Sequence, residues 1–124
     1  MKMSNEVGAV FDAAPEETRA GMMHLRDRVL SVAEDLDLPV REELRWGEPA
    51  YLAPKGSTLR IAAPKSGGFA IYAHCATSLI SDFASVAPCR TEKNRAVLFD
   101  TIDEAKAAPL DLLITAALTY HATR

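Results

Sequence analysis

The spacing of apolar residues changes near residue 39, and that change decides which elements can form on either side of it. Before it, apolar side chains recur three and four positions apart, as on one face of a helix. These residues are Met22, Leu25, Val29, Val32 and Leu36. Pro39 marks the end of the helix, and from Val40 the spacing shortens toward two, which is typical of strands. The sequence therefore predicts a long amphipathic helix followed by a sheet.

Short turns separate the predicted strands. The alternation predicts strands over about 40–46, 49–53, 58–64, 69–74 and 95–99. The turns at 54–57 and 66–68 favour antiparallel pairing. Helices are predicted at 5–13, from Pro15, at 77–84, from the capping box Thr101–Glu104, and from Pro109 to about Thr123. We expect one α+β domain over residues 1–124, with a mostly antiparallel sheet of about five strands and helices on one face.

Composition and charge narrow the classes of partner. The chain has 124 residues, 48% hydrophobic and 25% charged, which is ordinary for a globular domain. The net charge is −3 and the basic residues are scattered, so we expect no nucleic-acid partner. Neither a signal-peptide apolar region nor a membrane-length apolar run is present, so we expect a cytoplasmic protein with no membrane partner. Cys75 and Cys89 are expected to be buried, reduced thiols.

The segment Arg45–Tyr51 places the single tryptophan beside a glycine and a proline. Gly47 and Pro49, two positions apart, predict a sharp bend, and Trp46 is expected to cover a core edge or to form the floor of a small pocket. We expect Gly47→Ala and Pro49→Ala to destabilise the fold. If the indole is buried, Trp46→Ala should cost about 3–5 kcal/mol.

The chain resembles the YdhG-like domains of unknown function over nearly its whole length. The resemblance rests on the helix segment Leu25–Val29, the segment Trp46–Tyr51, Lys65 before a hydrophobic strand, and Arg95–Phe99 before a helix started by Pro109. It implies a two-layer fold in which a curved antiparallel sheet packs on N- and C-terminal helices. It implies no reaction, because the family has no established catalytic residues. One branch is described as frataxin-like intracellular iron chaperones. The loop His74-Cys75-Ala76 departs from the family pattern because it lacks a glycine.

No set of residues satisfies the spacing of a catalytic or metal site. His74 and Cys75 are adjacent on a predicted strand and should point to opposite faces. His24 and His121 lie far away in the sequence and show no ligand spacing. We assign no catalytic residue, no metal ligand and no cofactor. An enzyme that pairs Cys75 with His74 or His121 stays an alternative.

Acidic residues gather near the ends of the long helix and the first strand. They are Glu16, Glu17, Glu34, Asp35, Asp37, Glu42 and Glu43. Exposed carboxylates bind hard cations through oxygen, so a weak iron-binding chaperone is the alternative function. A solvated face, with arginines that partly neutralise it, explains the same residues without a ligand.

The outer face of the predicted sheet is the leading candidate site. Alternation places Arg60, Tyr72 and His74 on one face, opposite the apolar face, and four further residues are expected close by if the sheet curves. The complete predicted ligand-binding set is Arg45, Trp46, Tyr51, Arg60, Lys65, Tyr72 and His74. Aromatic walls with convergent cations suit a small anionic or aromatic ligand. We therefore expect a non-enzymatic small-ligand-binding module. Aromatic cross-strand pairs with no ligand are the competing explanation.

The last helix is apolar almost all round. Leu110, Leu113 and Ala117 share one stripe, while Ile114 and Leu118 lie on another side. One monomer should not cover all of it. We expect either a fully buried helix or a homodimer built partly on it.

Overall fold

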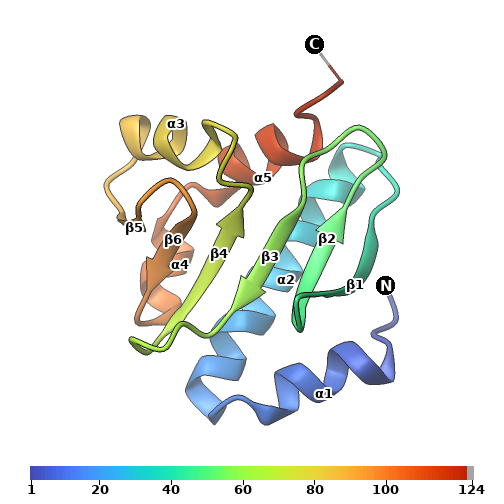
Figure 1. The fold of residues 1–124 in the computed structure, drawn as a ribbon, viewed down its shortest axis with the longest axis vertical. Helices are drawn as coiled ribbons and strands as arrows, with labels where there is room; N and C mark the ends of the chain where they lie inside the picture. The colour runs from blue at the N-terminus through green and yellow to red at the C-terminus, as the bar shows by residue number, and fades with distance from the viewer. Residues whose placement is uncertain (123–124) are drawn as a thin grey trace.

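The computed structural model describes residues 1–122 and shows an α+β fold of two layers (Figure 1). The helices are α1 (Asn5–Ala13), α2 (Glu16–Asp35), α3 (Leu79–Val86), α4 (Ile102–Ala107) and α5 (Leu110–Leu118). The strands are β1 (Arg41–Arg45), β2 (Glu48–Leu52), β3 (Leu59–Ala62), β4 (Phe69–Ala73), β5 (Arg90–Glu92) and β6 (Ala96–Phe99). They form one antiparallel sheet in the order β1-β2-β3-β4-β6-β5. The predicted fold class is confirmed.

Several boundaries differ from the sequence prediction by one to two residues, and two differences are larger. β5 is a sixth strand that the sequence did not predict, because its residues Arg90–Glu92 are all exposed and carry no apolar alternation. The last helix ends at Leu118 rather than near Thr123, which lies outside the described residues. None of the helices in residues 1–122 combines the length and the apolar composition that a bilayer span requires.

The hydrophobic core lies between the sheet and the helices behind it in Figure 1. Four members of the predicted α2 stripe, Met22, Leu25, Val29 and Val32, are buried where α2 packs on β3 and β4, but the fifth, Leu36, is 37% exposed. In addition, α1 packs on β1 and β2, and α4 packs on β6. Gly21 lets α2 approach the sheet closely, because a Cβ there would lie 2.1 Å from the ring of Phe69. The position of α2 relative to β4 therefore depends on this glycine.

The terminal helix α5 is covered mainly by its own chain. Ile114 and Leu118 are fully buried, because α2 and α3 pack against α5. The expectation that one monomer cannot cover this helix is therefore wrong for most of its surface. Leu112 remains 58% exposed beside the exposed Val86 of α3. A homodimer through α5 stays a prediction.

The loop between β2 and β3 is tied to the end of α5. The Ser57 backbone N–H donates to the Ala117 carbonyl at 2.8 Å, and the His121 N–H donates to the Lys55 carbonyl at 2.8 Å. A Cβ at Gly56 would lie 2.8 Å from the Leu118 carbonyl oxygen, so only glycine fits at this contact. The loop thereby supplies a donor for one of the last carbonyls of the helix, that of Ala117, and an acceptor for the His121 N–H beyond its end.

No described helix crosses the front face of the sheet in Figure 1, and we call this the outer face. The predicted alternation is confirmed: Leu59, Ile61, Phe69 and Ile71 belong to the core, and Arg60 and Tyr72 point the other way. Buried alanines alternate with these larger outer side chains. They are Ala50, Ala62, Ala70 and Ala96. The outer face is therefore a floor of small residues with larger side chains standing on it.

Candidate functional site

Trp46 and Gly47 form the two-residue turn between β1 and β2. Arg45 pairs with Glu48 across the turn, and the φ angles of Trp46 and Gly47 are 51° and 75°. Positive φ at both central residues is the geometry of a type I′ hairpin. Pro49 is not part of the bend as predicted; it lies in β2 opposite Leu44. The indole is 84% exposed, so the expectation that it covers a core edge is wrong.

The backbone of Trp46 is unfavourable for a residue of this size. An L-residue in the left-handed region costs about 1–2 kcal/mol relative to the right-handed one, and Asn or Gly usually occupies such a turn. The exposed indole recovers little of this cost by burial. An exposed aromatic residue whose backbone is strained in this way is more readily explained by a function than by a contribution to stability.

Arg60 lies between the two aromatic side chains of the outer face. Its guanidinium carbon is 5.1 Å from the centroid of the Trp46 ring and 5.2 Å from that of Tyr72, both within cation–π range. Arg60 and Tyr72 are direct cross-strand partners, and Nη1 of Arg60 pairs with the Glu48 carboxylate. We call these four residues, Trp46, Glu48, Arg60 and Tyr72, the aromatic–arginine cluster.

The cluster is only partly shielded from solvent. The side chains of Arg60 and Glu48 are 22% and 31% exposed. Within residues 1–122, the one hydrogen bond of the Arg60 side chain is that from Nη1 to Glu48, so its other N–H groups face no protein acceptor. Burial raises the pKa of Tyr72, and the carboxylates of Glu92 and Glu48 raise it further. Tyr72 is therefore a neutral phenol at physiological pH.

Three other predicted site residues lie on the exposed surface outside the cluster. Arg45 stands beside the hairpin and donates to Glu43 at 2.8 Å. Lys65 lies in the turn between β3 and β4, and His74 follows β4, where its Nδ1 accepts from the Ala76 N–H at 3.0 Å. No hydrogen bond, ion pair or ring contact within residues 1–122 joins Lys65 or His74 to the cluster. The structure thus unites Trp46, Arg60 and Tyr72. Arg45 adjoins them as the cross-strand partner of Glu48, but its side chain turns to Glu43, and Lys65 and His74 lie apart.

Tyr51 lies on the opposite face from the predicted site. It is 0% exposed in the core, and its hydroxyl donates to Oε2 of Glu42 at 2.7 Å. Arg26 of α2 donates to the same carboxylate through Nε at 2.5 Å and Nη2 at 3.0 Å. We call Arg26, Glu42 and Tyr51 the buried triad. The assignment of Tyr51 to a ligand site is therefore a correction, because the side chain has no access to solvent.

Electrostatics bind the buried triad together. Burial raises the pKa of Tyr51, and the hydrogen bond to Glu42 raises it further. The hydrogen bond from Arg26 to Glu42 raises the pKa of the guanidinium, which opposes the effect of burial. Nη2 of Arg26 also donates to the Met1 carbonyl at 3.1 Å. Each buried polar group of the triad thus has a partner, as a buried charge requires.

The acidic residues considered for iron do not form one ridge. Glu42 is enclosed in the buried triad with a side chain only 3% exposed. Glu43 points to the other face, where it pairs with Arg41 and Arg45. Within residues 1–122, no three His, Cys, Asp or Glu side chains are grouped so as to hold a metal ion. Glu42 and Glu43 are adjacent in the sequence, but their carboxylates lie on opposite faces of the sheet and cannot share one cation.

The turn between β5 and β6 contains a residue that the sequence analysis missed, and its side chain binds the loop after β4. Asn94 binds the carbonyls of Cys75 and Thr77 through Nδ2 and accepts from the Ser81 N–H through Oδ1 at 3.2 Å. Its side chain therefore holds the loop and the start of α3 against β6. Cys75 in this loop is exposed and Cys89 is half-buried, so the prediction of two buried thiols is wrong. The sequence gave no signal for this role of Asn94, because its hydrogen-bond partners lie 13 to 19 residues away in the chain.

Candidate nucleophiles have no histidine base in contact. Ser78 donates to Asp82 at 2.8 Å, and Ser81 and Ser85 donate to backbone carbonyls. Within the described 122 residues, no hydrogen bond joins a histidine ring to a serine or cysteine side chain. These serines serve the local structure of α3.

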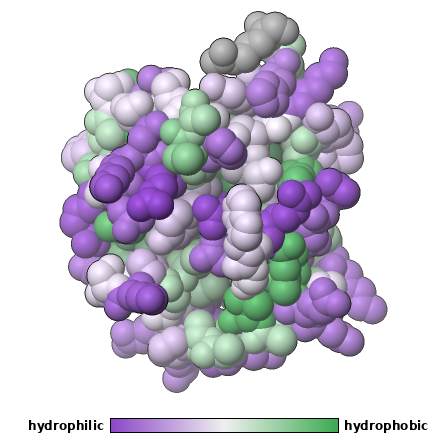
Figure 2. All heavy atoms as spheres, viewed as in Figure 1, coloured by the Kyte–Doolittle hydropathy of each residue, from purple (hydrophilic) through white to green (hydrophobic). Residues whose placement is uncertain are grey.

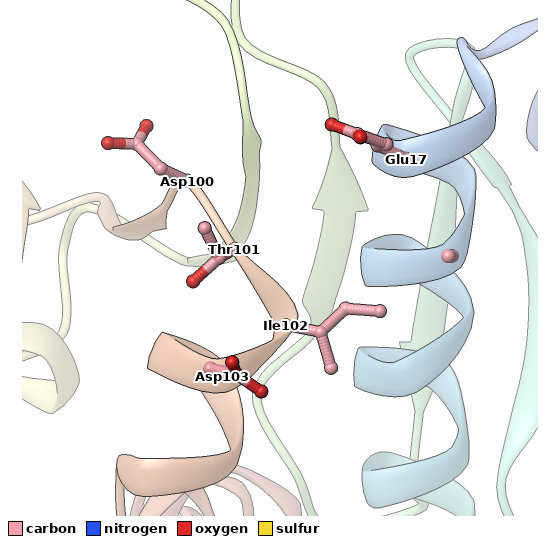
Figure 3. A pocket seen from close by; sticks show the side chains of 6 residues that line it. Glu17, Asp100, Thr101, Ile102 and Asp103 are labelled. Atoms are coloured by element: carbon pink, nitrogen blue, oxygen red, sulfur yellow. The ribbon is translucent and has the colours of Figure 1, made fainter.

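A hollow of ≈ 290 Å³ lies between the starts of α2 and α4 (Figure 3). Figure 3 shows Ile102 directed toward α2, with the carboxylates of Glu17, Asp100 and Asp103 around the opening. Two of its polar groups already have partners: Thr101 caps α4 by accepting from the Glu104 N–H at 3.2 Å, and Asp100 pairs with Arg90. The hollow is a gap between two packed helices, and Thr101 and Asp100 at its edge already serve the local structure.

Comparisons of the chain with known protein families, with curated proteins and with solved structures give no match. The function must therefore be argued from the geometry of the outer face.

Proposed function

We propose that this protein is a non-enzymatic binding module of the YdhG-like type, which holds a small planar aromatic ligand on the aromatic–arginine cluster. The observation that carries the proposal is Trp46, an indole 84% exposed and kept at a positive φ of 51°. The cation–π contact with Arg60 engages the indole, yet most of its surface stays exposed to solvent on a strained backbone, which is the arrangement expected of a binding residue.

The cluster offers two complementary contacts to such a ligand. The open face of the Trp46 indole can stack on an aromatic ring, a contact of about 0.5–1.5 kcal/mol beyond the area that it buries. The uncommitted N–H groups of Arg60 can donate to a carboxylate or carbonyl on that ring. Because Glu48 and Tyr72 already fix the guanidinium, little side-chain entropy is lost on binding. A planar aromatic acid is the ligand class that uses both contacts.

The single tryptophan makes the proposal directly testable. Benzoate should change the Trp46 fluorescence with a dissociation constant of about 1 mM, as befits a ligand of few atoms. Cyclohexanecarboxylate, which has the same charge but no aromatic ring, should bind much more weakly. Arg60→Gln should weaken benzoate binding about tenfold or more, because the charged donor is lost.

Arg41→Gln is the matched control, since Arg41 is an exposed arginine of β1 that pairs with Glu43 outside the cluster. It should leave benzoate binding unchanged. Equal binding of benzoate and cyclohexanecarboxylate, or equal effects of the two arginine substitutions, would refute the proposal.

A further inference from the structure

A shallow apolar cavity, wide open to solvent, lies where the corner between α1 and α2 meets the start of β2 and the end of β3. Its volume is ≈ 320 Å³, at the lower end of the range for small-molecule sites. Val10 and Ala13 of α1 form one wall, Ala63 after β3 forms another, and the core residues Met22 and Ile61 close the floor. Figure 2 shows a group of hydrophobic side chains low on this view, toward α1.

Glu48 connects this cavity to the aromatic–arginine cluster. It is the one charged residue in the cavity lining, and its carboxylate also pairs with Arg60, which lies over the Trp46 ring. The cavity and the cluster are therefore neighbours on either side of one carboxylate. A ring seated on Trp46 and held by Arg60 would have the cavity within reach past Glu48.

We infer that the aromatic ligand carries an unbranched apolar chain, and that the chain fills this cavity. The inference rests on the proposed function, since it extends the ligand of the same cluster. Apart from Glu48, the lining consists of apolar side chains. Water finds few hydrogen-bond partners there, whereas an alkyl chain would gain free energy by burying its apolar surface. Alanines at positions 13 and 63 leave the space open. The ligand class is thus an alkyl-substituted aromatic acid.

The chain length of the ligand gives a quantitative test. Benzoate, 4-butylbenzoate and 4-hexylbenzoate are titrated against Trp46 fluorescence, and binding is mapped by amide chemical shifts. Affinity should rise by up to about fourfold per buried methylene, which corresponds to about 0.8 kcal/mol. The additional shifts caused by the chain should fall on α1 and on the end of β3, not on the α3–α5 side of the molecule.

Two substitutions that fill the cavity with a larger side chain test whether the alkyl chain lies there. Ala13→Leu and Ala63→Leu, from opposite walls, should abolish the gain from the alkyl chain and leave benzoate binding unchanged. Ala9→Leu is the matched control, because Ala9 is an exposed residue of the same helix outside the cavity lining. It should leave the chain-length dependence intact.

The outcomes separate the two proposals. Equal affinity for benzoate and its alkyl derivatives overturns the inference and leaves the proposed function standing. A chain-length gain that survives both Ala13→Leu and Ala63→Leu also overturns it, because the chain then lies elsewhere. Failure of every benzoate to bind at Trp46 overturns the proposed function, and the inference falls with it.

Discussion

The two faces of the sheet carry the same set of polar residues in opposite surroundings. On the core side, Arg26 of α2 meets Glu42 and Tyr51 of the sheet, and the Glu42 side chain is 3% exposed. The outer face has Arg60, Glu48 and Tyr72, and the Glu48 side chain is 31% exposed. Inside, the carboxylate accepts from both partners, and each hydrogen bond is satisfied within the protein. Outside, the guanidinium keeps free donors, the Trp46 indole is open to solvent and Tyr72 is half-buried. The same residue types thus hold the fold together on one face and offer a binding surface on the other.

The difference in burial sets how much each carboxylate matters to stability. Glu42→Gln removes the charge that neutralises buried Arg26, and should lower the free energy of unfolding by about 3–5 kcal/mol. Glu48→Gln is the matched control on the outer face, and should cost less than about 1 kcal/mol because solvent can replace the partner. Urea unfolding followed by circular dichroism measures both. Equal costs for the two variants would contradict the comparison.

The two tyrosines should respond differently to alkaline pH. The pKa of both is raised in the fold, and burial is the first cause in each case. Above about pH 10 the unfolded chain releases phenol protons that the folded chain retains, so stability present below pH 10 is lost as the pH rises.

Tyr51→Phe should therefore remove more of this alkaline loss than Tyr72→Phe, since Tyr51 is fully buried and Tyr72 is half-exposed. The measurement is the free energy of unfolding from pH 8 to pH 11 for the two variants and the wild type. An equal pH dependence for the two variants would show that the faces do not differ in this respect.

The outer face should also show a conflict between stability and binding. Trp46→Asn places the favoured Asn-Gly pair in the type I′ turn, and should raise the free energy of unfolding by about 0.5–1 kcal/mol while abolishing benzoate binding. Trp46→Leu is the control, which should abolish binding without the gain in stability. Amide chemical shifts report binding in both variants. A loss of more than 1 kcal/mol on Trp46→Asn would mean that the indole stabilises the turn.

Local pattern predicted the fold but not the roles of individual polar residues. The α2 stripe and the alternation in β3 and β4 are local signals, and they placed the core correctly except for Leu36, which is exposed at the end of α2. By contrast, Glu42 and Glu43 are adjacent acidic residues that look alike in the sequence. Glu42 is the buried one because Arg26 of α2 pairs with its carboxylate. Tyr51 was assigned to the wrong face of β2: it lies on the core side with Glu42, its direct cross-strand partner in β1.

The turn residues show a second limit of sequence reasoning. Gly47 correctly predicted a bend. The sequence did not show that Trp46 is the first of the two turn residues or that Pro49 lies in β2. Left-handed backbone is uncommon for tryptophan, so residue preference argued against the observed geometry. Arg60 and Tyr72 were placed correctly, because register within antiparallel strands follows from period-two alternation.

The contact between the β2–β3 loop and α5 bears on how the protein matures during translation. The N–H of Ser57 and the carbonyl of Lys55 find their partners at Ala117 and His121, about sixty residues further along the chain. While the ribosome is still adding those residues, the loop has no partner and the core lacks the apolar side of α5. The domain therefore closes only after α5 has left the exit tunnel, and a ribosome stalled before that point would display an incomplete core to chaperones.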